Sequence, residues 1–126
     1  MINEYDFLKN FYIPNNFLLT TQHRKYENNT KINTLIYQEQ YHNNFPSIMI
    51  QFIEDTEYFE RRINTNLIIR ESYVNNERVM IFSKNMIETE NGILYAIFQR
   101  DNFSFCITTN ELNKEEFLAM LQAILK

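Results

Sequence analysis

Hydrophobic and polar residues alternate along most of this chain, which is the pattern of β-strands with one buried face. The clearest case is the segment 103–108, in which apolar residues alternate with small or polar ones: Phe103, Ser104, Phe105, Cys106, Ile107 and Thr108. The segment 93–98 is apolar at nearly every position and is therefore predicted to lie inside the sheet. In total the pattern predicts antiparallel strands near 17–25, 31–41, 46–53, 67–74, 77–84, 93–99 and 103–109.

Asparagine-rich pairs separate these strands, because the chain contains only one Gly and two Pro. Asn28 with Asn29, and the polar segment 99–102, predict turns, since Asn and Asp tolerate positive φ and can bond their own backbone. The pair Asn75 and Asn76 predicts a hairpin with a type I′ turn, which needs positive φ at both central residues.

The last residues predict an amphipathic helix that covers one face of this sheet. Apolar residues recur there at helical spacing: Phe117, Met120, Leu121 and Ile124. Asn113 is a suitable N-cap, three residues before Glu116, which is close to a capping box. Such a stripe is typical of a helix that faces a core. We therefore expect Phe98, Phe105 and Ile107 to share the main core with Leu121.

The chain of 126 residues is predicted to be a single α+β domain, 1–126, with a helical lead-in at 1–13 and the sheet plus C-terminal helix at 14–126. A short N-terminal helix is expected over 3–11. We expect its Tyr5, Leu8 and Phe11 to cover part of the sheet face opposite the C-terminal helix. The charged segment 54–66 predicts a partly helical connection.

The overall charge and hydropathy exclude some function classes. The net charge of −4 argues against a surface that follows a phosphate backbone, so no nucleic-acid partner is expected. No apolar run approaches about eighteen residues, so no membrane span is predicted. The first residues lack the apolar region of a signal peptide. The chain is expected to be either cytosolic or part of a longer protein, and the lone Cys106 leaves the compartment open.

The residue types that carry chemistry form no constellation. Neither His23 nor His42 has a carboxylate or Cys at metal-ligand spacing, and Cys106 has no local base that would form a thiolate. The acidic residues between 54 and 60 lack the alternating oxygen ligands and central Gly of a calcium loop. We therefore predict no catalytic residue, no cofactor and no metal site, and expect that the protein is not an enzyme.

Four segments carry a resemblance to a known family. They are 12–17 (YIPNNF), 74–81 (VNNERVMI), 96–107 (AIFQRDNFSFCI) and 112–117 (LNKEEF). Together they resemble an extracytoplasmic domain of unknown function from Gram-positive bacteria, found in anti-sigma-factor-like and sporulation-associated membrane proteins. Phe98 stands where that family usually has Trp, and its turn glycines are Asn here. The resemblance implies a curved antiparallel sheet of about six or seven strands with the C-terminal helix on its concave face, and it brings no catalytic residues.

Three functions remain open at this point. The first is a non-catalytic regulatory or protein-interaction domain, extracytoplasmic in its full-length context if the resemblance holds. The second is a small cytosolic partner-binding protein of the immunity-protein or secretion-chaperone type. The third and least favoured is a small ligand-binding enzyme. For either of the first two, the partner is another protein or a second copy. The candidate partner surface is apolar: Met49, Tyr58, Phe59, Ile68, Met80 and Phe82.

Overall fold

The alternating segments form one antiparallel sheet of seven strands. The structure is a computed structural model that describes residues 5, 8, 11–39, 46–62, 69–83, 93–110, 112 and 114–126. All seven predicted strands are confirmed, with ends within three residues of those expected. They are β1 (Phe17–Glu27), β2 (Thr30–Glu39), β3 (Ser47–Ile53), β4 (Ile69–Val74), β5 (Glu77–Ser83), β6 (Leu94–Arg100) and β7 (Phe103–Asn110).

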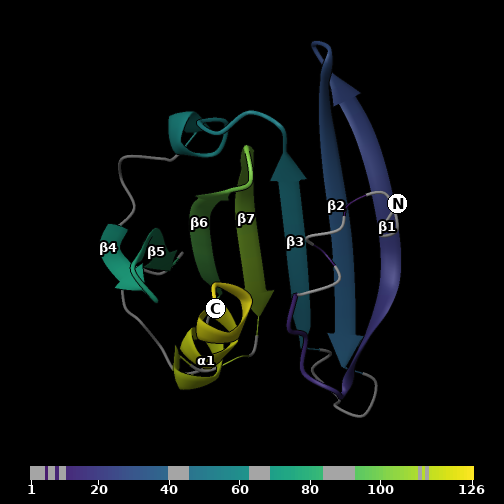
Figure 1. Ribbon diagram of the computed structural model, residues 1–126. Helices are drawn as coiled ribbons and strands as arrows, with labels where there is room; N and C mark the ends of the chain where they lie inside the picture. The colour runs from purple at the N-terminus through teal and green to yellow at the C-terminus, as the bar shows by residue number, and fades with distance from the viewer. Residues whose placement is uncertain are drawn as a thin grey trace.

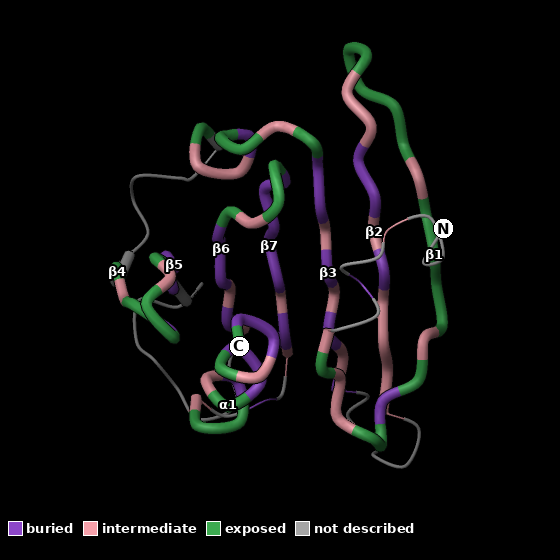
Figure 2. Tube along the Cα trace, in the orientation of Figure 1, coloured by how far each residue is buried: buried purple, intermediate pink, exposed green. Residues whose placement is uncertain are grey.

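The order of the strands across the sheet is β1-β2-β3-β7-β6-β5-β4, and every neighbouring pair is antiparallel. As predicted, β6 lies inside the sheet, between β7 and β5. In Figure 1, β1, β2 and β3 are seen along their lengths, whereas β4 and β5 are seen nearly end-on, so the sheet is curved. Figure 2 shows that β1 is largely exposed, whereas β3, β6 and β7 are mostly buried.

Three hairpins in the sheet turn through two residues that both have positive φ. The values are 50° and 67° at Asn28 and Asn29, 50° and 68° at Asn75 and Asn76, and 53° and 68° at Asp101 and Asn102. Positive φ at both positions defines the type I′ turn, whose twist matches that of the flanking strands. The turn predicted at Asn75 and Asn76 is therefore confirmed, and the other two hairpins use the same geometry without any glycine.

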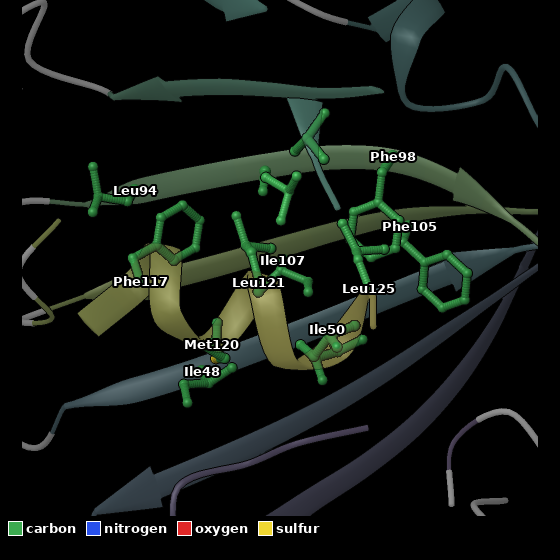
Figure 3. Packing of buried hydrophobic residues seen from close by; sticks show 14 of the residues in the cluster. Ile48, Ile50, Leu94, Phe98, Phe105, Ile107, Phe117, Met120, Leu121 and Leu125 are labelled. Atoms are coloured by element: carbon green, nitrogen blue, oxygen red, sulfur yellow. The ribbon is translucent and has the colours of Figure 1, made fainter. Parts of the chain in front are cut away.

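Helix α1 (Lys114–Ile124) packs its apolar stripe on one face of the sheet. The stripe is fully enclosed, since Phe117 and Leu121 are 0% exposed. Figure 3 shows Leu121 beside Ile107, Leu125 toward Phe98 and Phe105, and the Phe117 ring toward Leu94. The expected core is confirmed, because all of these residues belong to one buried cluster. Among the described residues, this is the face that carries the main core.

Side chains from two hairpin regions hold the C-terminal end of α1. The Arg100 guanidinium, at the end of β6, donates to the carbonyl oxygens of Ile124 (2.7 Å) and Lys126 (3.3 Å). From the β4–β5 turn, Asn75 Nδ2 donates to the carbonyl of Gln122 at 2.6 Å. The last carbonyl groups of a helix lack partners within the helix. These contacts therefore satisfy them and fix the angle of α1 on the sheet.

The N-terminal helix predicted at 3–11 falls mostly outside the described residues, and none is seen among those that are described. Two backbone hydrogen bonds join these residues, from Leu8 N to Tyr5 O (3.2 Å) and from Phe11 N to Leu8 O (3.3 Å). The expected position of these residues was wrong. Leu8 is buried in the main core, and the Tyr5 ring contacts Phe52 edge-on at 5.2 Å. They therefore pack on the same side of the sheet as α1. A cluster of aromatic rings on that side provides their contacts.

Candidate functional site

The sheet face opposite α1, called the second face below, carries Met49, Tyr58, Phe59 and Met80 of the predicted partner residues. The strand register aligns its side chains in rows that cross the sheet. One row runs through Ile36, Met49, Thr108 and Tyr95 on β2, β3, β7 and β6. The next row contains Thr34, Gln51, Cys106 and Ile97 on the same strands, and continues to Met80 on β5.

The centre of the second face carries no charged residue. Because side chains alternate between the two faces of a strand, the register assigns to this face one residue in two from each central strand. We call these residues the uncharged patch: Thr30, Ile32, Thr34, Ile36 and Gln38 of β2, Ser47, Met49, Gln51 and Ile53 of β3, Ser104, Cys106, Thr108 and Asn110 of β7, and Tyr95, Ile97 and Gln99 of β6. Charged residues make up 22% of the whole chain, so their absence across four strands is a local property of this patch.

Charged side chains return at the rims of the second face. On β1, Lys25 Nζ lies 4.0 Å from a carboxylate oxygen of Glu27. On the opposite rim, Arg78 of β5 forms ion pairs with Glu71 of β4 and with Glu60, the latter at 3.3 Å. These carboxylates hold the pKa of Arg78 above its usual value, the Glu71 hydrogen bond contributing most. Both rims therefore carry charges that are already paired within the chain.

Residues 54–62, which follow β3, cover one end of the second face. The segment consists of turns and the 3-10 helix η3 (Glu60–Arg62), so the predicted partly helical connection is confirmed over its described residues. Tyr58 is only 8% exposed and packs with Ile32 and Ile53. Phe59 contacts Tyr58 edge-on, with ring centroids 5.2 Å apart, and also packs against the group formed by Met80, Ile97 and Cys106. These residues occupy the position that the N-terminal segment was expected to fill.

The structure brings together part of the predicted partner surface. Phe59 and Met80 share one cluster, and Tyr58 anchors the segment above it. Met49 lies half-buried in the uncharged patch, one row away from that cluster. The backbone of Phe82 pairs with Tyr95, which places residue 82 in the row of Met49. Ile68 lies outside the described residues.

Sequence reasoning missed the polar and half-buried members of the patch. Ile36, Thr108 and Tyr95 lie beside Met49, but they were not predicted, because their nearness to Met49 depends on the order of the strands. The alternation of β2 and β7 does show which residues share a face. What it does not show is which strands are neighbours, and only the order β2-β3-β7-β6 reveals that their uncharged positions are contiguous.

Cys106 is the one thiol of the chain, and it lies within the patch at 8% exposure. Burial raises its pKa to about 11, although the Thr108 hydroxyl, 3.9 Å from Sγ, acts in the opposite direction. The thiol is therefore protonated at neutral pH, and only the thiolate is a strong nucleophile. The pKa of the neighbouring Tyr95 is also raised, chiefly by burial. In this setting both residues act as packing and hydrogen-bonding groups.

A pocket of about 380 Å³ opens beside the β1–β2 turn, between the N-terminal Tyr5 and the start of the segment 54–62. Two of the ionic side chains that line it, Lys31 and Asp55, contact other residues of the chain. The Lys31 ammonium lies 6.0 Å from the centroid of the Tyr5 ring. The Asp55 carboxylate is held in an ion pair by Arg61 and accepts a hydrogen bond from Glu57 N at 3.1 Å. This arrangement stabilises the loop, and it does not direct an acid and a base toward a common point.

The described residues contain neither a metal-binding group nor a membrane-spanning helix. Within the described ranges, no group of three or more His, Cys, Asp or Glu side chains is placed to hold a metal ion. The one α-helix of that part of the chain is too short and too polar to cross a membrane. No protein-family model, no curated protein and no solved structure matches the chain. The resemblance to an extracytoplasmic domain therefore stays a prediction.

Proposed function

We propose that this chain is a non-catalytic protein-interaction domain and that its partner binds the uncharged patch on the second face. The observation that carries the proposal is the lack of any charged residue on this face of four adjacent strands, in a chain where 22% of the residues are charged. The centre of a protein interface is depleted of charged residues, whereas its rim is polar. The second face has this organisation, with paired charges on β1 and on β4–β5.

The composition of the patch favours a protein over other ligands. It combines apolar side chains such as Met49 and Ile36 with hydroxyl and amide groups such as Thr108 and Gln51, most of them half-buried. Groups of this kind form hydrogen bonds without the large desolvation cost of a charge. A sheet face with such groups suits another folded surface rather than a small molecule, which needs a concave site.

Two observations support a role without catalysis. The thiol of Cys106 is protonated, because burial raises its pKa to about 11. The carboxylates of Asp55, Glu60 and Glu71 are engaged by arginines that hold the segment 54–62 and the β4–β5 hairpin. These four side chains stabilise the fold, and none of the four is poised as a nucleophile or general base. The proposal holds equally for an extracytoplasmic regulator and for a cytosolic partner-binding protein, which differ in location but not in the binding face.

Site-specific photo-crosslinking tests the proposal. A benzophenone amino acid is placed at Gln51 in the patch and, as a matched control, at Ala119 on the exposed side of α1, and both proteins are irradiated in extract of the source cells. We expect a discrete protein adduct at Gln51 that is absent at Ala119 and is lost when Thr108→Lys puts a charge into the patch. The proposal fails if Gln51 forms no adduct, or if the two positions form the same adducts.

A further inference from the structure

We infer that the partner bound by the uncharged patch is a second copy of this chain, so that two second faces pack against each other in a symmetric dimer. This inference rests on the proposed function and names the occupant of the same site. A two-fold dimer brings identical patches together, so each residue must tolerate the residues of its own patch as neighbours. A patch without charges meets that condition, because no like charges are brought together.

The charge of the whole chain makes this condition a strict one. Each copy has a net charge of −4, so two copies repel at long range, and a neutral contact surface adds no close pairs of like charge to this repulsion. The rims do not add to this repulsion. Lys25 lies beside Glu27 on β1, and Arg78 is paired with both Glu71 and Glu60 on the other rim. The second face is therefore a surface on which two copies can meet without bringing like charges together.

The size of the patch fits a small dimer interface. Strands are spaced about 4.8 Å apart and rise about 3.3 Å per residue, so four strands over the seven residue pairs of β3 and β7 span about 19 by 23 Å. Including β1 and β5 widens this surface to about 29 Å. The resulting area is about 450 to 650 Å² per copy, and because the segment 54–62 already covers one end of the face, the total lies close to or below the roughly 1,000 Å² of a specific interface. Interfaces at this lower limit are weak, so we expect micromolar dissociation.

The geometry of the sheet allows such packing. Two sheets pack face to face with about 10 Å between them, with their side chains interdigitated. The row of Ile36, Met49, Thr108 and Tyr95 lies away from Tyr58 and Phe59, which cover the other end of the face. Thr108 occupies the middle of this row on β7, the fourth strand of seven, so it lies near the centre of the expected contact.

Sedimentation velocity and equilibrium over a range of protein concentration test the inference on the full chain. The matched variants are Thr108→Lys and Gln51→Lys in the patch and Ala119→Lys on the exposed side of α1, which changes the net charge equally. We expect the native chain to dimerise reversibly, the two patch variants to dimerise at least tenfold more weakly, and Ala119→Lys to match the native chain. Circular dichroism confirms that each variant is folded, and Gln51→Lys decides the matter if Thr108→Lys unfolds the chain.

The inference is overturned if the native chain stays monomeric up to about 1 mM, a concentration that would reveal even a weak dimer. It is equally overturned if the native chain dimerises and both folded patch variants do so with unchanged affinity. These outcomes are separate from the fate of the proposed function. A monomer whose Gln51 adduct with another protein is lost in Thr108→Lys retains the interaction role with a foreign partner, whereas a monomer without such an adduct loses both.

Discussion

Replacing Phe105 by alanine tests the main core most directly. This ring is 0% exposed at the centre of an aromatic group. It stacks on Phe98 with centroids 5.1 Å apart and an interplanar angle of 11°, and on Phe52 at 6.0 Å and 27°. Phe11 and Phe103 contact it at 5.5 and 6.3 Å. Phe105→Ala therefore removes a ring that the N-terminal segment, β3, β6 and β7 all contact.

The expected loss of unfolding free energy is about 3–5 kcal/mol, the usual range for a buried Phe→Ala change with its residual cavity. The upper half of this range applies, because aromatic pairs contribute about 0.5–1.5 kcal/mol beyond their buried area and several such pairs are lost. Domains of this kind are stable by only about 5–15 kcal/mol, so the variant will be close to its unfolding threshold.

Urea unfolding followed by circular dichroism measures this loss. With a slope of about 2 kcal/mol per M, a loss of 4 kcal/mol moves the midpoint down by about 2 M. Phe105→Leu keeps most of the apolar volume and should lose clearly less. The matched control is Tyr73→Ala, whose ring is 70% exposed and whose removal should change stability by about 0.5 kcal/mol or less. A loss below about 1 kcal/mol for Phe105→Ala would refute the assigned facing of β7.

Three further predictions address the turns, the helix end and the thiol. Asn76→Ala should destabilise the fold by about 1 kcal/mol, since φ of 68° strains a residue with a Cβ, whereas Asn76→Gly should be tolerated; urea midpoints compare the two. Arg100→Ala should lower the free energy of unfolding by about 1–3 kcal/mol, because it removes the two charge-assisted hydrogen bonds to the C-terminal end of α1. Arg100→Lys lacks the forked guanidinium and should restore only part of this stability, so a full rescue by Lys would contradict the capping role. Cys106 should resist alkylation at pH 8 until urea unfolds the chain. Because its folded pKa of about 11 lies above the usual 9.0, the stability it contributes is present below about pH 9 and is lost as the pH rises toward 11, a loss that should be smaller in Cys106→Ala.

Local signals were sufficient to predict the strands and their turns. The alternation of apolar and polar residues is a property of each strand alone, and it survives because one face of the sheet is buried beneath α1. The pairs at Asn28, Asn75 and Asp101 could be assigned to turns because Asn and Asp adopt positive φ at little cost. Such features depend on neighbours in the sequence, which explains why the strand ends were predicted within a few residues.

The side chosen by each covering segment depends on contacts that the sequence does not display. Tyr5, Leu8 and Phe11 form an apolar group that suits either face of the sheet equally well. They pack beside α1 because Phe52 and Phe105 present rings there, on strands that are distant in sequence. The segment 54–62 covers the second face for a similar reason, since Ile32 and Ile53 offer Tyr58 an apolar site next to the end of β3.

The uncharged patch illustrates why a surface can be invisible in a sequence whose strands are all predicted. Each central strand contributes only three to five residues to it, and strands without charges on one face are common in proteins. The pattern becomes unusual only when β7 is placed beside β3. β7 begins more than sixty residues after the end of β2. The uncharged faces of the four strands then form one continuous surface bordered by ion pairs. Solubility alone does not require such a surface, because charged residues at these half-buried positions would serve it better. Binding to a protein surface favours it, since each charge in the centre of an interface would have to lose its water.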